Sequence, residues 1–115
     1  MKTFAVAVVC AAALALVPVA MAKAPAGVPH SGSYSAARKF LLKGGWKPVH
    51  QPDPGFKCPP GDQRCEGRPE TVDCAGTGLG NCIFRWKRKG VVVDVMTAGE
   101  TDPQINGVRC KKGCR

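Results

Sequence analysis

The chain has 115 residues, of which 17 are Lys or Arg and 8 are Asp or Glu, so its formal net charge is +9 at pH 7. This length suits a single domain with a small core. Beyond the first 22 residues no apolar stretch approaches the roughly 20 residues that a membrane-spanning helix needs, which argues against an integral helical membrane protein.

The first 22 residues predict a signal peptide. Lys2 provides a basic start, residues 4–19 form an apolar run, and Ala20-Met21-Ala22 has the small-residue pattern of a cleavage site. A transmembrane anchor is the alternative, but the run is short and Pro18 interrupts its end. We therefore expect a periplasmic or secreted protein.

A flexible leader and one domain are expected after the cleavage site. Residues 23–32 are rich in Pro, Ala and Gly and lack apolar periodicity, which favours a leader. Residues 33–115 then form a single small domain. The whole chain contains 14 Gly and 10 Pro, so its core should be thin, and disulfides are the usual supplement.

A short helix is predicted directly after the leader. Ser33 or Ser35 can cap its start, and Gly44-Gly45 can end it. Apolar residues three and four positions apart give this helix one apolar face, formed by Tyr34, Ala37, Phe40 and Leu41.

A β-hairpin is predicted over residues 82–97. Residues 82–87 alternate between an apolar and a mostly basic face, and residues 91–97 are rich in β-branched side chains. The segment Arg88-Lys89-Gly90 between them suits a tight turn. An isolated hairpin is marginally stable in water, so the predicted helix should cover its apolar face.

Short flanking strands complete the predicted sheet. Residues 46–50 are expected to be extended, with Pro48 restricting them to an edge. Asp102-Pro103 and Asn106-Gly107 are turn signals, after which residues 108–110 could add a last strand. The sequence therefore predicts an α+β fold with one N-terminal helix packed on a small antiparallel sheet.

Six cysteines remain after removal of Cys10 with the signal peptide. They admit fifteen pairings, between which the sequence alone does not choose. We favour local pairs, because each would close a short ring, and the pair at residues 58 and 65 would stabilise the proline-rich loop of residues 51–68. The alternative ties Cys110 back to the core. The favoured pairs are Cys58 with Cys65, Cys74 with Cys82, and Cys110 with Cys114.

Two motifs that suggest ligand binding have structural interpretations. Residues 76–80 resemble a phosphate-binding glycine loop, but they lead into a predicted strand, whereas such loops open a helix. The cysteine spacings lack the close CxxC pairs typical of zinc sites, and an exported chain meets an oxidising compartment. We expect neither a metal nor a cofactor.

An enzyme is not expected either. His30 and His50 lie in or beside proline-rich segments without a nucleophile that either could activate. Scattered acidic residues in the cysteine loops are interpreted as solvated charges. These residues are Asp62, Glu66, Glu70 and Asp73.

Basic residues gather in two places, around the predicted hairpin turn and at the C terminus. If the corresponding strands are adjacent, the two groups could merge into one patch that binds an anionic partner. A basic surface without a ligand is the alternative. The candidate binding residues are Arg85, Lys87, Arg88, Lys89, Lys111 and Lys112.

The order of motifs resembles small exported proteobacterial proteins of uncharacterised function. The resemblance covers most of the chain after the cleavage site, residues 23–115, and it implies no functional residues because its motifs are aromatic, cysteine and turn positions. This chain departs from the pattern in its pair Cys58 and Cys65 and in its C-terminal CKKGC. The shared motifs are Gly45-Trp46, Pro69-Glu70, Cys74 with Gly76, Cys82-x-Phe84-x-Trp86 and Thr97-Ala98-Gly99-Glu100.

The leading functional hypothesis is an exported, disulfide-stabilised interaction module without enzymatic activity, whose partner is an acidic protein or an envelope polyanion. Nucleic acid is not expected as a partner in that compartment. The alternative hypothesis is a cationic protein that acts on anionic envelope polymers, with an antimicrobial role as one form of that activity.

Overall fold

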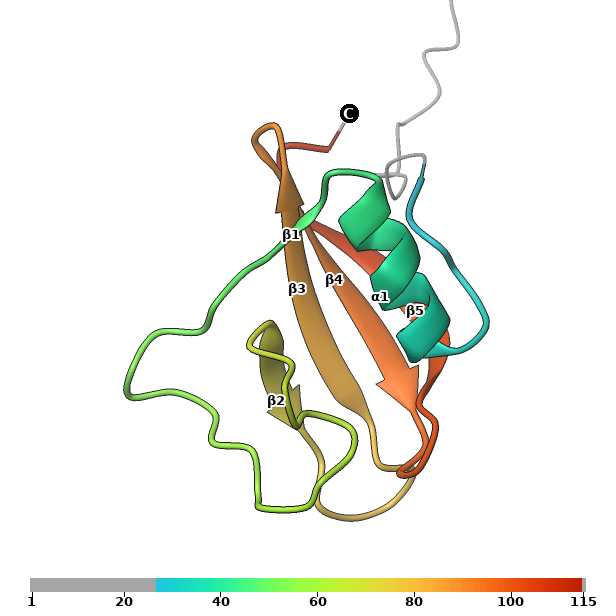
Figure 1. Cartoon of the computed structure of the whole chain (residues 1–115), viewed down its shortest axis with the longest axis vertical. Helices are drawn as coiled ribbons and strands as arrows, with labels where there is room; N and C mark the ends of the chain where they lie inside the picture. The colour runs from blue at the N-terminus through green and yellow to red at the C-terminus, as the bar shows by residue number, and fades with distance from the viewer. Residues whose placement is uncertain (1–26, 115) are drawn as a thin grey trace, which may run out of the picture.

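The computed structural model describes residues 27–114, so the predicted signal peptide lies outside the described part of the chain. None of the helices in that part is long and apolar enough to cross a membrane. The chain order of the elements is shown in Figure 1: α1 (Tyr34–Lys43), β1 (Lys47–Pro48), β2 (Thr71–Cys74), β3 (Cys82–Arg88), β4 (Val91–Ala98) and β5 (Gln104–Lys112).

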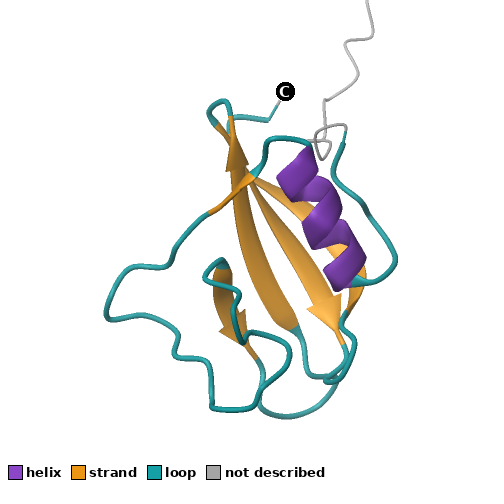
Figure 2. Ribbon diagram, in the orientation of Figure 1, coloured by secondary structure: helices purple, strands orange, loops and turns teal. Residues whose placement is uncertain are grey.

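The strands form one antiparallel sheet, and α1 lies across one of its faces (Figure 2). The strand order is β1-β3-β4-β5, and β2 pairs with a different part of β3. The opposite face of the sheet carries no helix in residues 27–114. This arrangement confirms the predicted α+β fold.

The predicted hairpin is confirmed. In its register Cys82 pairs with Thr97 at one end, and Arg88 pairs with Val91 at the other. Lys89 and Gly90 form the turn with φ values of 48° and 78°. Two positive φ values are typical of the tight two-residue turns that match the twist of antiparallel strands, and Gly90 adopts this conformation without strain.

The helix ends where the sequence predicts, but its apolar face is narrower than expected. Ser33 is the N-cap, and its hydroxyl accepts a hydrogen bond from the Ala36 amide at 3.5 Å. Tyr34, Ala37 and Leu41 are buried, whereas 55% of the Phe40 surface is exposed. Phe40, which was expected on the apolar face with these three residues, does not take part in covering the sheet, because the three buried side chains occupy the side of α1 that faces it.

The segment before the helix is packed onto the sheet. Val28 is 4% exposed, and the Gly32 carbonyl accepts a hydrogen bond from the Ile105 amide at 2.8 Å. The described part of the expected leader, residues 27–32, therefore contributes to the core.

The last strand is longer than predicted, since β5 begins at Gln104. Asn106-Gly107 was expected to form a turn, but it lies inside β5, beside an irregularity in its pairing with β4. Gly107 pairs with Met96, and a Cβ atom at Gly107 would lie 2.8 Å from the Met96 Cε atom. The glycine thus makes room for a side chain on the neighbouring strand.

All three disulfides are the favoured local pairs: Cys58–Cys65, Cys74–Cys82 and Cys110–Cys114. The second joins β2 to β3 at positions that are directly paired in the sheet. Cys58–Cys65 closes a ring within a loop, and Cys110–Cys114 closes a ring at the C-terminal end of β5. This pairing rules out the alternative in which Cys110 is tied back to the core.

A buried carboxylate holds α1 on the sheet. Glu70, interpreted from the sequence as a solvated loop charge, is 0% exposed, so that interpretation was wrong. Its Oε1 atom accepts hydrogen bonds from the Tyr34 hydroxyl at 2.9 Å and from Arg38 Nε at 2.6 Å. Tyr34 in turn accepts one from Trp86 Nε1 at 3.0 Å. The network therefore connects two helix residues, one loop residue and one strand residue.

Protonation states in this network favour its hydrogen bonds. Burial, together with the nearby Glu70 carboxylate, raises the pKa of the Tyr34 hydroxyl far above its usual value, so the hydroxyl keeps its proton. The hydrogen bond to Glu70 raises the pKa of Arg38, which remains charged. Tyr34 and Arg38 are thus both competent donors at neutral pH.

We expect Glu70→Gln to lower the free energy of unfolding by about 2 to 3 kcal/mol, because it removes the charge partner of Arg38 and one strong acceptor of Tyr34. Chemical denaturation followed by circular dichroism measures the change. Glu66→Gln is the matched control, since Glu66 is exposed. Equal stabilities of the two variants would contradict a structural role for the buried carboxylate.

Candidate functional site: a basic hollow at the hairpin turn

A concave region with a volume of about 560 Å³ lies at the end of the sheet where β3 turns into β4. Figure 1 shows that the C-terminal segment of the chain lies beside this turn. We call the region the basic hollow. It is lined by Lys47, Lys87, Arg88, Lys89 and Lys112, together with Gly44, Gly45, Gly90 and Val92.

Strand register places three of these lysines in one row. Lys47 pairs with Lys87, Lys87 with Val92, and Val92 with Lys112. Directly paired residues in an antiparallel sheet point to the same face. The row therefore crosses all four strands β1, β3, β4 and β5 on one face, with Val92 as its single uncharged member.

This row lies on the face opposite the helix. Trp86, the neighbour of Lys87 in β3, is fully buried in the core that includes α1 residues, and successive strand residues point to opposite faces. The lysines are consequently exposed, and the sheet beneath them is held rigidly by the core on its other side.

Arg88 approaches the basic hollow from the helix side. Its Nη1 atom donates a hydrogen bond to the Gly44 carbonyl at 2.9 Å, and its guanidinium carbon lies 4.6 Å from the centre of the Trp46 ring. Gly44 follows the last helical residue, where helix carbonyls carry partial negative charge. Arg88 therefore neutralises the helix end that borders the hollow and has a fixed orientation.

The Cys110–Cys114 ring packs against the hairpin turn. Gly113 has φ of 75°, and a Cβ atom there would lie only 2.3 Å from the Gly90 carbonyl oxygen. Only glycine allows this approach. The ring therefore holds the end of β5, and Lys112 with it, beside the turn.

Positive charge in the basic hollow is not balanced by acidic side chains. All eight Asp and Glu residues lie within residues 27–114, and none lines the hollow or forms an ion pair with its five basic residues. Like charges so close to one another repel, and this repulsion opposes folding.

The structure brings together four of the six predicted binding residues: Lys87, Arg88, Lys89 and Lys112. Lys111 is exposed but does not line the hollow, because it lies where the pairing of β5 with β4 is irregular. Lys47 was missed. Its only sequence signal was the expected extended segment of residues 46–50.

Arg85 lies outside the basic hollow, although it was among the predicted binding residues. It pairs with Asp94 directly across the sheet, with hydrogen bonds of 2.8 and 3.0 Å to the two carboxylate oxygens. These bonds raise the pKa of Arg85. Since Asp94 is 2% exposed, Arg85 serves to neutralise a buried carboxylate.

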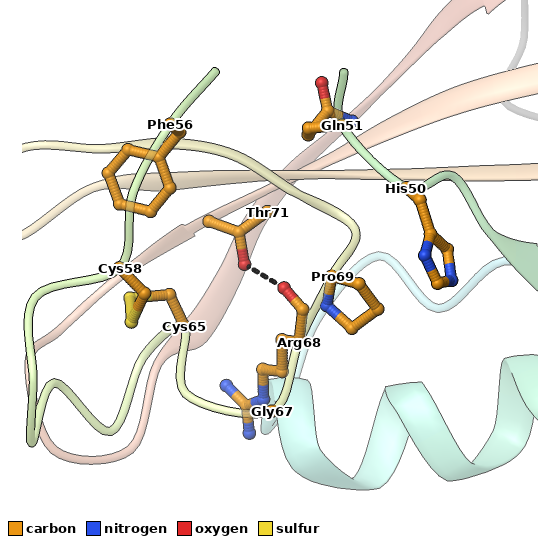
Figure 3. Close-up of a pocket in the computed structure, with 9 residues that line it drawn as sticks. All are labelled: His50, Gln51, Phe56, Cys58, Cys65, Gly67, Arg68, Pro69 and Thr71. Carbon is orange, nitrogen blue, oxygen red and sulfur yellow. Dashed lines mark hydrogen bonds between the residues drawn. A yellow bond between two sulfur atoms is a disulfide. The ribbon is translucent and has the colours of Figure 1, made fainter. Parts of the chain in front are cut away.

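A second hollow, of about 430 Å³, lies between the proline-rich loop of residues 51–68 and β2 (Figure 3). The Cys58–Cys65 disulfide and Phe56 line one side, and His50 lies at the other. The Thr71 hydroxyl donates a hydrogen bond to the Arg68 carbonyl at 2.7 Å. The cysteines are oxidised and the hydroxyl is engaged, so this hollow offers no activated nucleophile.

Metal-binding geometry is also missing from the part of the chain that the structure describes, where no three His, Cys, Asp or Glu side chains are grouped to hold an ion. Residues 76–80, the glycine loop, connect β2 to β3, both of which are strands. This context differs from that of phosphate-binding loops, which open a helix.

Comparisons with protein-family models, with curated proteins and with solved structures found no match for this chain. The functional assignment therefore depends on the geometry of the basic hollow.

The double variant Lys87→Gln/Lys112→Gln should be more heat-stable than the unmodified protein at about 0.01 M salt, where charges act over roughly 30 Å. Each pair of like charges destabilises the fold by a few tenths of a kcal/mol. Removal of this repulsion corresponds to a rise in Tm of about 1 to 3 °C. At about 1 M salt the difference should disappear. Thermal unfolding followed by circular dichroism measures both values.

Lys39→Gln/Lys57→Gln is the control, because it removes the same charge from exposed positions outside the hollow. Lys57 pairs with Asp53 at 3.2 Å, but both side chains are exposed, so loss of this ion pair should change stability little. If Tm rose as much in this control as in Lys87→Gln/Lys112→Gln, the repulsion between basic residues would not be concentrated in the basic hollow.

Proposed function

We propose that this chain is an exported interaction protein, without catalytic activity of its own, that binds an anionic partner in the basic hollow. The observation that carries this proposal is the presence of five basic side chains around one concave region with no acidic side chain among them. Such a region concentrates positive potential, which attracts anions.

Rigidity supports a binding role for this surface. The hairpin turn, the C-terminal disulfide ring and the helix end each fix one side of the hollow. A preorganised site loses less conformational entropy when it binds a ligand.

Export is supported by the predicted signal peptide and by the three disulfides, since disulfides persist in oxidising compartments such as the periplasm or the extracellular space. Without the predicted signal peptide, which contains Lys2, the net charge is still +8, and this charge would speed the encounter of the protein with anionic surfaces there.

Retention on heparin and on immobilised poly-L-glutamate tests the proposal. We expect the oxidised protein to bind at least one of these polyanions and to elute as salt rises, because salt screens exposed charges. Lys87→Gln/Lys112→Gln should elute at clearly lower salt than Lys39→Gln/Lys57→Gln, which has the same net charge. Identical elution of the two double variants, or no retention of the unmodified protein at low salt, would refute binding in the basic hollow.

A further inference from the structure

We infer that the ligand of the basic hollow is a compact phosphate ester that carries two phosphate groups. This inference rests on the proposed function and specifies the chemistry of the partner. It depends on which side chains line the hollow, on how they are spaced, and on the size of the space between them.

The lining has few of the features of a protein-binding surface. Protein interfaces are depleted in lysine and depend on buried aromatic or aliphatic anchors, whereas four of the five charged residues here are lysines and Val92 is the one apolar side chain in the lining. The large exposed hydrophobic residues of the described chain do not line the hollow; they are Phe40, Leu42 and Leu79.

Lysine and arginine have complementary uses with phosphate. An ammonium group is a compact charge with three donors, which suits the dense charge of a phosphate. The planar fork of Arg88 can bind two oxygen atoms of one phosphate, and within residues 27–114 only its Nη1 atom is engaged, with Gly44. Its stacking on Trp46 leaves the other N–H groups in a fixed plane.

The spacing of the lysine row favours two anionic groups. Neighbouring strands lie about 4.8 Å apart, so the backbones of Lys47 and Lys87 are that close, while Lys112 is separated from Lys87 by the whole of β4, about 10 Å in total. One phosphate would contact the first two lysines, and a second would contact Lys112. Val92 between them offers an apolar surface for the scaffold that joins the phosphates.

The volume of the hollow agrees with a ligand of this kind. About 560 Å³ falls within the range of sites for small molecules, roughly 300 to 1,000 Å³. A single sugar with two phosphates fits such a space. The ester could be a free molecule or the phosphorylated end of an envelope polymer, because both present the same groups to the lysines.

The test is a calorimetric titration of the oxidised protein, produced by export, with fructose 1,6-bisphosphate, citrate and poly-L-glutamate. We expect the bisphosphate to bind at least about tenfold more tightly than citrate, a compact polycarboxylate. The double variant Lys87→Gln/Lys112→Gln should bind the bisphosphate at least about tenfold more weakly, since each substitution removes a charge-assisted hydrogen bond. Lys39→Gln/Lys57→Gln should bind as the unmodified protein does.

The outcomes separate this inference from the proposed function. Binding of poly-L-glutamate through Lys87 and Lys112, without binding of the bisphosphate, would overturn the phosphate assignment and leave the anion-binding function intact. Failure of all three probes, and of heparin, to bind would overturn both. Equal binding of bisphosphate and citrate would also overturn the preference for phosphate.

A competition experiment distinguishes the two sources of the ester. Lipopolysaccharide is added to the complex of the protein with the bisphosphate. If it displaces the bisphosphate at a lower phosphate concentration than added free bisphosphate does, and if this depends on Lys87 and Lys112, the ligand is the end of an envelope polymer. Weaker competition by lipopolysaccharide than by the free bisphosphate would assign it to a soluble ester. Either result agrees with two phosphates bound in the basic hollow.

Discussion

The buried carboxylate of Glu70 is the interaction on which the rest of the structure depends. It joins α1 to the sheet through Tyr34 and Arg38, and the Tyr34 hydroxyl extends the connection to Trp86 in β3. The Glu70 carbonyl also accepts the Arg85 amide at 2.9 Å, which fixes the loop on the edge of β3. A core this small gains specificity from a polar network because each member is satisfied in only one arrangement of helix and sheet.

Placement of the helix determines the geometry of the basic hollow. The end of α1 presents the Gly44 carbonyl to Arg88, and the chain then continues into β1, which brings Lys47 beside Lys87. On the other side, the C-terminal disulfide ring keeps Lys112 in line with them. Elements far apart in the sequence thus place lysines in one row, where no acidic side chain of residues 27–114 forms an ion pair with them. A folded chain that tolerates the repulsion between these lysines is consistent with selection for binding at the expense of some stability.

The sequence predicted those features that depend on local patterns. Alternation over residues 82–97, the Ser33 cap and the short cysteine rings each involve neighbouring residues, and the structure agrees with all three.

Features that depend on distant contacts were not predictable in this way. Glu70 in a proline- and glycine-rich stretch has the pattern of a solvated charge, and only the positions of Tyr34 and Arg38 explain its burial. Likewise Asn106-Gly107 occurs in turns and in irregular strands alike, and Met96 on the neighbouring strand decides between them. Lys47 joined the candidate site only through the pairing of β1 with β3.

The most direct test of this account is to map the anion-binding surface by nuclear magnetic resonance, with amide chemical shifts followed as a heparin hexasaccharide is added to the oxidised protein. If the anion binds in the basic hollow, the largest shift changes will occur in residues 44–47, 87–92 and 112, which border it. Changes confined to the hollow beside His50 and the Cys58–Cys65 disulfide, or to the exposed side of α1, would contradict this account.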